Sequence, residues 1–229
     1  MIDTYAWARG REGVLRMGPM ASPTILILPP LFEEANRTRR ILVEVMRGLA
    51  ASGLASALPD LPGTNDSIVA TVDARFADWA EAVGVLAATL PRPLLTVAVR
   101  GGCLLDGFAH ADAAYRLSPE TGARLLRDML RASALTAGVK TAALTAEARA
   151  WPTRLAGNLI HPELFAAIEH AVPDAIDARR ATIGDGTGDV DMVFAGGPPW
   201  RTAEPGDNAP LVQALTKDII FWATTCVVN

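Results

Sequence analysis

Several residue types that would point to particular classes of protein are scarce in this sequence. It holds only two cysteines, Cys103 and Cys226, in 229 residues, which excludes a disulfide framework, and no Cys-x-x-Cys spacing suggests zinc. No apolar run approaches the roughly 20 residues that span a bilayer, and the N-terminal segment MIDTYAWARGREG lacks the apolar stretch of a secretory signal. We therefore expect a cytoplasmic protein without a membrane span.

Basic residues do not outnumber acidic residues either. The chain has 21 Lys and Arg against 25 Asp and Glu, a net charge of −4, so it offers no broad attraction to nucleic acid or to an anionic membrane. The local cluster of Arg37, Arg39 and Arg40 does not change this. Aromatic residues are only 6% of the chain, but half of the residues are apolar, which is ample for the core of one large α/β domain over residues 1–229.

The order of the apolar segments predicts the sheet. Residues 24–28 (TILIL), 54–58 (LASAL) and 94–99 (LLTVAV) are apolar without alternation, as in strands that are covered on both faces. Helical spacing of apolar residues lies between them, from Asn36 to Gly53 and over about residues 73–90. This strand–helix rhythm predicts a doubly wound, mostly parallel sheet.

The flanking segments complete the predicted order. Residues 4–9 and 13–17 predict a hairpin that turns at Arg11-Glu12-Gly13, and the run CLLDGFAHA after residue 102 predicts a helix. Further helices are expected over residues 120–130, 145–151, 163–170 and 208–223, and further strands over 178–183 and 191–195. In an α/β-hydrolase, a helical insertion such as residues 118–171 forms a cap over the site.

The turn after the third apolar strand has the small residues of a nucleophile elbow. In α/β-hydrolases the nucleophilic serine lies at this turn within Gly-x-Ser-x-Gly. Here the run is Ala98-Val99-Arg100-Gly101-Gly102, so arginine stands at the elbow. A guanidinium stays protonated at ordinary pH and cannot attack a carbonyl. We interpret the nearby Cys103 as a buried apolar cysteine rather than a replacement nucleophile.

The general base of a serine triad is also missing. In this fold it is a histidine after the last strand, but His110, His161 and His170 all precede that strand. The loop after residue 195 instead reads Gly-Gly-Pro-Pro-Trp. The sequence therefore predicts an α/β-hydrolase scaffold without its usual triad.

The loop after the first central strand holds candidate site residues. Residues 31–40 (LFEEANRTRR) occupy the place of an oxyanion hole. They can be interpreted as a helix start with Asn36 as N-cap and acidic residues beside the dipole, or as a site whose carboxylate pairs with Arg100. The second interpretation also accounts for the arginines, which oppose the dipole. The candidates are Glu33 and Glu34 for catalysis, and Asn36, Arg39 and Arg40 for ligand binding.

A second polar loop follows the neighbouring strand. In residues 60–67 (DLPGTNDS), Asp60 and Asp66 either line the same crevice or only form turns. Gly101 joins the candidate ligand-binding residues because it lies beside the elbow. The acidic run over residues 185–191 has Val190 and Gly196 where a calcium-binding loop needs glycine and glutamate, so we predict no metal and no cofactor.

Residues 28–40 (LPPLFEEANRTRR) and 58–67 (LPDLPGTNDS) resemble the exosortase A system-associated hydrolases. These α/β-hydrolase-like proteins are encoded with bacterial exopolysaccharide and PEP-CTERM sorting genes, and they tend to carry arginine at the elbow, as Arg100 does. Residues 155–164 (LAGNLIHPEL) and 197–200 (GPPW) resemble later parts of the family. The two glycines after Arg100 depart from it, because a bulkier residue usually follows the arginine there.

These features leave three hypotheses. The chain could hydrolyse an ester or thioester through water activated by Glu33, Glu34 or Asp66. It could bind an anionic or acyl ligand without catalysis, held by Arg100 with Arg39 and Arg40. It could be a scaffold subunit among exopolysaccharide-system proteins. Each is compatible with a homodimer.

Overall fold

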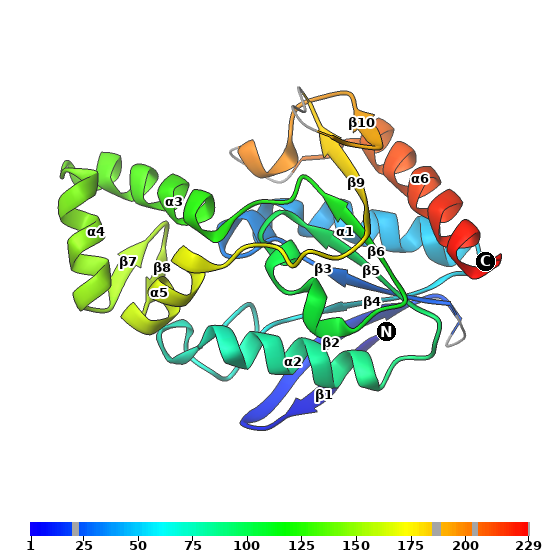
Figure 1. Ribbon diagram of the computed structural model, residues 1–229, viewed down its shortest axis with the longest axis horizontal. Helices are drawn as coiled ribbons and strands as arrows, with labels where there is room; N and C mark the ends of the chain where they lie inside the picture. Colours follow the sequence, from blue (N-terminus) through cyan, green and yellow to red (C-terminus); the bar gives the residue numbers. More distant parts are fainter. Residues whose placement is uncertain (20–22, 185–188, 203–205, 229) are drawn as a thin grey trace.

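One eight-stranded sheet forms the centre of the molecule, with the order β1-β2-β4-β3-β5-β6-β9-β10 (Figure 1). The computed structural model describes residues 1–19, 23–184, 189–202 and 206–228. The strands of the sheet are β1 (Ile2–Trp7), β2 (Gly10–Met17), β3 (Thr24–Leu28), β4 (Ala55–Pro59), β5 (Leu94–Val99), β6 (Ala113–Leu117), β9 (Ala178–Ile183) and β10 (Met192–Phe194).

The pairing of the strands confirms a doubly wound, mostly parallel sheet. β2 pairs antiparallel with β1 and with β4, whereas every neighbouring pair from β4 to β10 is parallel. β3 and β5 have the predicted bounds, and all their residues are buried, because an apolar run without alternation suits a strand covered on both faces. Alternate residues separate onto the two faces: Ile25 and Ile27 belong to one core cluster, and Leu26 and Leu28 to the other.

Helices cover both faces of this sheet. On one face α1 (Glu33–Ala51) and α6 (Ala209–Val228) pack against each other, and on the other lies α2 (Phe76–Ala88), preceded by the 3-10 turn η1 (Thr71–Asp73) (Figure 1). The prediction that Asn36 caps the first helix is wrong. The helix begins at Glu33 after Phe32, whose side chain makes no cap, so Asn36 lies inside the first turn.

The structure corrects two local predictions and adds a strand. The β1–β2 turn lies at Ala8 and Arg9, because Gly13 pairs with Thr4 inside the ladder. The run after the elbow forms the 3-10 segments η2 (Arg100–Leu104) and η3 (Asp106–Ala109) rather than an α-helix, in keeping with its glycines. Strand β6 was not predicted, because Arg116 interrupts its apolar pattern.

Between β6 and β9 the chain forms a separate group of elements, at the left of Figure 1. They are α3 (Gly122–Ala137), α4 (Thr141–Ala150), the hairpin of β7 (Thr153–Leu155) and β8 (Asn158–Ile160), and α5 (Pro162–His170). The three helices overlap their predicted ranges, but α3 continues to Ala137 rather than residue 130 and α4 begins at Thr141 rather than residue 145. The hairpin was not predicted. That residues 118–171 form a cap within a single domain stays a prediction.

Two further predictions can be compared with the structure only over the described residues. The acidic run over residues 185–191 lies mostly outside them, so its structure is not described. Within the described segments, no helix combines the length and the apolar character needed to cross a bilayer.

Candidate functional site

The chain turns sharply at Arg100, directly after β5. The φ of Arg100 is 54°, a value that residues other than glycine seldom adopt. A Cβ on Gly102 would lie 2.5 Å from the backbone oxygens of Leu28 and Pro29, so the close approach of this turn to the end of β3 requires glycine. Gly101 is also buried, and a Cβ there would meet Leu31 at 3.1 Å.

The Arg100 side chain is held by two carboxylates. Its Nε and Nη2 donate to the two carboxylate oxygens of Glu34 at 3.2 and 3.1 Å, and its Nη1 donates to Glu120 Oε2 at 3.0 Å. Burial alone would lower the pKa of Arg100, but the hydrogen bonds and charges of Glu34 and Glu120 outweigh it and raise that pKa. Arg100 is therefore a buried, fully compensated cation. A carboxylate from residues 31–40 does pair with it, which is one of the two interpretations that the sequence left open for this loop.

Trp200 covers the guanidinium of Arg100. The Arg100 Cζ lies 5.0 Å from the centroid of the indole, and Trp200 is only 5% exposed. Trp200 belongs to the 3-10 turn Pro199–Arg201 that follows β10, and its carbonyl accepts from Arg37 Nη1 at 2.9 Å. The loop after the last strand thus closes over the turn after β5.

Glu33 lies beside Glu34 but has a different environment. Its Oε2 is buried and has no hydrogen-bond partner among the described residues. Burial raises the pKa of Glu33, an effect that the charge of Arg37 partly opposes. In the first turn of α1, both oxygens of Glu34 therefore bind Arg100, whereas one oxygen of Glu33 has no partner among the described residues.

The arginines of residues 37–40 do not converge on one anion site. Arg39 Nη1 donates to Asp60 Oδ1 at 2.9 Å, and Asn65 Nδ2 donates to the same oxygen at 2.5 Å. Arg37 is bound to the Trp200 carbonyl, as described above. Asp66 is exposed, and within the described segments no hydrogen bond or ion pair links it to Arg100. Asp60 is thus part of a separate ion pair, in which its own side chain is 10% exposed and that of Arg39 is 40% exposed.

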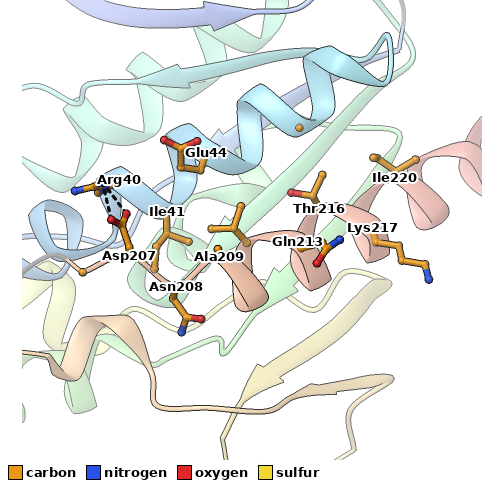
Figure 2. Close-up of a pocket in the computed structure, with 13 residues that line it drawn as sticks. Arg40, Ile41, Glu44, Asp207, Asn208, Ala209, Gln213, Thr216, Lys217 and Ile220 are labelled. Atoms are coloured by element: carbon orange, nitrogen blue, oxygen red, sulfur yellow. Dashed lines mark hydrogen bonds and ion pairs between the residues drawn. The ribbon is translucent and has the colours of Figure 1, made fainter.

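Arg40 lies at a groove on the other side of α1, between α1 and α6 (Figure 2). Its Nη2 is 2.7 Å from Asp207, at one end of this groove of about 610 Å³. The walls are mostly apolar and include Ile41, Ala209 and Ile220. Arg40 is therefore not brought together with Arg100.

A smaller pocket of about 140 Å³ lies at the carboxyl ends of β3 and β4. The loops after these two strands form most of it, together with Trp79 of α2 and Asn158 of β8. Leu31 and Phe32 contribute apolar surface. None of the described residues that line it is ionisable; the polar side chains are Asn36, Thr64, Asn65, Thr71 and Asn158.

The remaining nucleophile and base candidates lie elsewhere. Cys103 is completely buried, its thiol donates to the Ala98 carbonyl at 3.4 Å, and burial raises its pKa, so the interpretation as a buried apolar cysteine is confirmed. His161 accepts from the Glu163 backbone at the start of α5. In the described segments no hydrogen bond joins a histidine to Arg100, and no three His, Cys, Asp or Glu side chains form a group suited to a metal.

Comparison with known proteins identifies the fold. The structure superposes on mouse alpha/beta hydrolase domain-containing protein 10 with a TM-score of 0.65 and 13% identity, covering 98% of this chain and 99% of the other. The chain has the α/β-hydrolase fold. No protein-family model matches it, and no curated protein matches it in sequence.

Two further α/β-hydrolase-fold structures agree over nearly the whole chain. Est1E from Butyrivibrio proteoclasticus, solved with ferulic acid, gives a TM-score of 0.62 at 14% identity, covering 95% of this chain and 97% of that one. The thioesterase domain from the curacin biosynthetic pathway gives 0.57 at 15% identity, with 96% and 98% covered. At these identities the likeness shows the fold alone.

Sequence reasoning missed Glu120 and Trp200 as partners of Arg100. Glu120 lies three residues after the end of β6, and a polar residue in the loop after a central strand is the signal that could have found it. Because β6 was not predicted, Glu120 was assigned to a helix instead. Trp200 was noted only as part of the loop after the last strand, since nothing in the sequence indicates which side chain an indole will cover.

Proposed function

We propose that this protein is a ligand-binding member of the α/β-hydrolase fold that does not carry out serine-type acyl transfer. The arrangement around Arg100 carries this proposal. An activated nucleophile needs an adjacent base and a free attacking atom. Here the residue after β5 is a cation held by Glu34 and Glu120, and Trp200 covers it from the loop where the triad histidine is expected.

The same contacts argue against Arg100 as the binding site for an anion. Its side chain is 11% exposed, and an anionic ligand would have to displace Glu34 or Glu120, whose own side chains are 13% and 7% exposed. A displaced Glu34 would be buried without a cation, and a displaced Glu120 would keep only the exposed Arg124, and either outcome is costly. We therefore propose that the ligand binds in the 140 Å³ pocket beside this turn.

Hydrolysis of an ester or thioester is the second candidate, and Glu33 is the observation that favours it. A carboxyl group with an unpartnered buried oxygen and a raised pKa is a stronger base than an ordinary surface carboxylate. In this alternative Glu33 activates a water molecule, which attacks the acyl carbon and displaces the alcohol or thiol.

The sequence motifs shared with the exosortase A system-associated hydrolases support a biological setting for this proposal. In that setting the protein is bacterial and cytoplasmic and acts with exopolysaccharide-system proteins. A role as a scaffold subunit or homodimer is compatible with it.

Hydrolysis assays separate the two candidates. We expect the wild-type protein to cleave p-nitrophenyl acetate and an acyl-thioester no faster than an equal amount of the Glu33→Gln variant. Arg100→Ser should also remain at background, because in the described part of the chain no histidine is hydrogen-bonded at position 100 to act as its base. Turnover by the wild type that Glu33→Gln abolishes, with Glu147→Gln unaffected as an exposed control, would reject the binding proposal in favour of hydrolysis.

A further inference from the structure

The groove between α1 and α6 has the size and the lining of a small-molecule site (Figure 2). Ile41 of α1 lies on one side of it, and Ala209 and Ile220 of α6 lie on the other. Its volume of about 610 Å³ is within the roughly 300–1,000 Å³ of ligand pockets, which are also lined mainly by apolar side chains. Nothing in the proposed function makes use of this groove.

The space in the groove depends in part on Gly48 of α1. A Cβ at this position would lie 2.6 Å from Thr216 Cγ2, so a side chain there would press on α6. Glycine weakens the interior of a helix, because the unfolded chain gains more freedom at glycine than at other residues. Gly48 and Thr216 both line the groove, so the missing side chain leaves room between the two helices.

The charged side chains that line the groove are paired, with one exception. Arg40 and Asp207 form an ion pair at one end, and Glu44 is paired with Arg47. Lys217 lies toward the other end (Figure 2), and in the described part of the chain it forms no ion pair or hydrogen bond. The groove thus offers one cation whose charge is not compensated.

We propose that this groove is a ligand site of its own, which binds a small amphiphile with one apolar chain and an anionic head, such as a medium-chain carboxylate. The chain lies between Ile41 and the apolar residues of α6, where removal of its surface from water drives binding. The carboxylate lies near Lys217, whose aliphatic stem lines the groove while its ammonium reaches the rim. A cationic head would meet this ammonium and no uncompensated carboxylate among the described lining residues.

Three probes with the same chain test the choice of head group: octanoate, 1-octanol and octylammonium. Saturation-transfer difference NMR titrations, at concentrations below those at which micelles form, give their affinities. We expect octanoate to bind about two- to five-fold more tightly than octanol, the range of a partly exposed ion pair, and octylammonium to bind most weakly. Decanoate should bind more tightly than octanoate, by up to about four-fold for each added methylene that is buried.

Two pairs of variants show whether binding occurs in the groove. Lys217→Gln should reduce the affinity for octanoate to that for octanol and leave octanol unchanged, whereas Lys140→Gln, at the exposed residue before α4, should change neither. Ala209→Trp, at an exposed position on the groove wall, should abolish binding of octanoate and octanol. Ala214→Trp, also exposed on α6 but outside the groove, should not.

Several results would overturn this proposal. Equal affinities for the three probes, or an octanoate affinity that Lys217→Gln leaves unchanged, would mean that the groove does not recognise an anionic head. No binding, or binding that Ala209→Trp leaves intact, would mean that the groove is not the site.

Other occupants of the groove would give different results. A wild-type dimer that Ala209→Trp dissociates would assign the groove to a second copy of the chain. Flotation with phosphatidylglycerol vesicles, without binding of monomeric octanoate, would assign it to a membrane surface. Either result also overturns the proposal. None of these results bears on the 140 Å³ pocket, so the proposed function is tested separately.

Discussion

The guanidinium of Arg100 lies over the indole of Trp200, with its Cζ 5.0 Å from the ring centroid. Arg100 comes directly after β5 and Trp200 comes after β10, at opposite ends of a long stretch of sequence. Contact between them joins the central turn to the loop after the last strand. A cation over an indole face is attracted by the ring quadrupole, and the attraction grows as water is excluded.

Removal of Trp200 should therefore destabilise the fold. We expect Trp200→Ala to lower the free energy of unfolding by about 3–5 kcal/mol, because it opens a cavity and uncovers Arg100. Trp151→Ala is the matched control, since Trp151 is 70% exposed. Urea unfolding followed by circular dichroism measures both. Equal effects of the two substitutions would show that Trp200 does not hold the loop.

Removal of the charge of Arg100 should be equally costly. Arg100→Met leaves Glu34 buried without its cation and leaves Glu120 with only the exposed Arg124, and we expect a loss of about 3–5 kcal/mol at neutral pH. The triple variant with Glu34→Gln and Glu120→Gln should recover most of it, because no buried charge then remains. A triple variant as unstable as the single one would mean that packing by Arg100, rather than its charge, is what matters.

Gly102 should tolerate no side chain. In Gly102→Ala the new Cβ would lie 2.5 Å from the backbone oxygens of Leu28 and Pro29, which cannot rotate away as a side chain could. We expect a loss of about 1–3 kcal/mol from overpacking, measured as a lower Tm. Gly197→Ala is the control, because nothing lies within 4 Å of its Cβ position. A Tm for Gly102→Ala that matches this control would contradict the close approach.

Glu12 should make stability depend on pH. It is 2% exposed, and burial raises its pKa above the ordinary 4.5, with Asp60 adding to the shift and Ser67 and Trp7 opposing it. Its ionised form is therefore disfavoured in the folded state, and the cost appears as pH rises from the unfolded pKa through the raised folded one.

Glu12→Gln should remove this cost. We expect it to stabilise the fold at pH 7 by about 1 kcal/mol, and the gain should disappear below about pH 4, where the carboxyl is protonated in both states. Exposed Glu147→Gln should change little at either pH. Unfolding free energies at the two pH values provide the check, and a gain that persists at low pH would exclude desolvation of the carboxylate as its source.

The Cys103 thiol should be unreactive in the folded protein. It is completely buried and its pKa is raised, so little thiolate forms and reagents have no access. In a Cys226→Ser variant we expect no reaction with Ellman's reagent under native conditions and reaction of one thiol in denaturing urea. Rapid native labelling of that variant would show that Cys103 is accessible.

Local apolar patterns were enough to predict much of this molecule. The uninterrupted runs of β3 and β5, and the helical spacing between them, indicated the doubly wound sheet, because a strand covered on both faces needs no polar residues. The order of residues also placed Arg100 at the turn after β5 and showed that no histidine follows the last strand. The acidic residues of the 31–40 loop offered one possible partner for Arg100, and Glu34 is that partner in the structure.

Only the tertiary structure decided which groups meet. Strand β6 escaped prediction because Arg116 breaks its apolar pattern; in the fold that guanidinium is buried against Asp106, at 2.6 Å. Glu120 reaches Arg100 from the segment after β6, and Trp200 reaches it from the segment after β10. Arg39 and Arg40, adjacent in sequence, pair with Asp60 and Asp207 in separate places. Side chains next to each other on a helix face different directions, so their partners depend on which elements pack beside them.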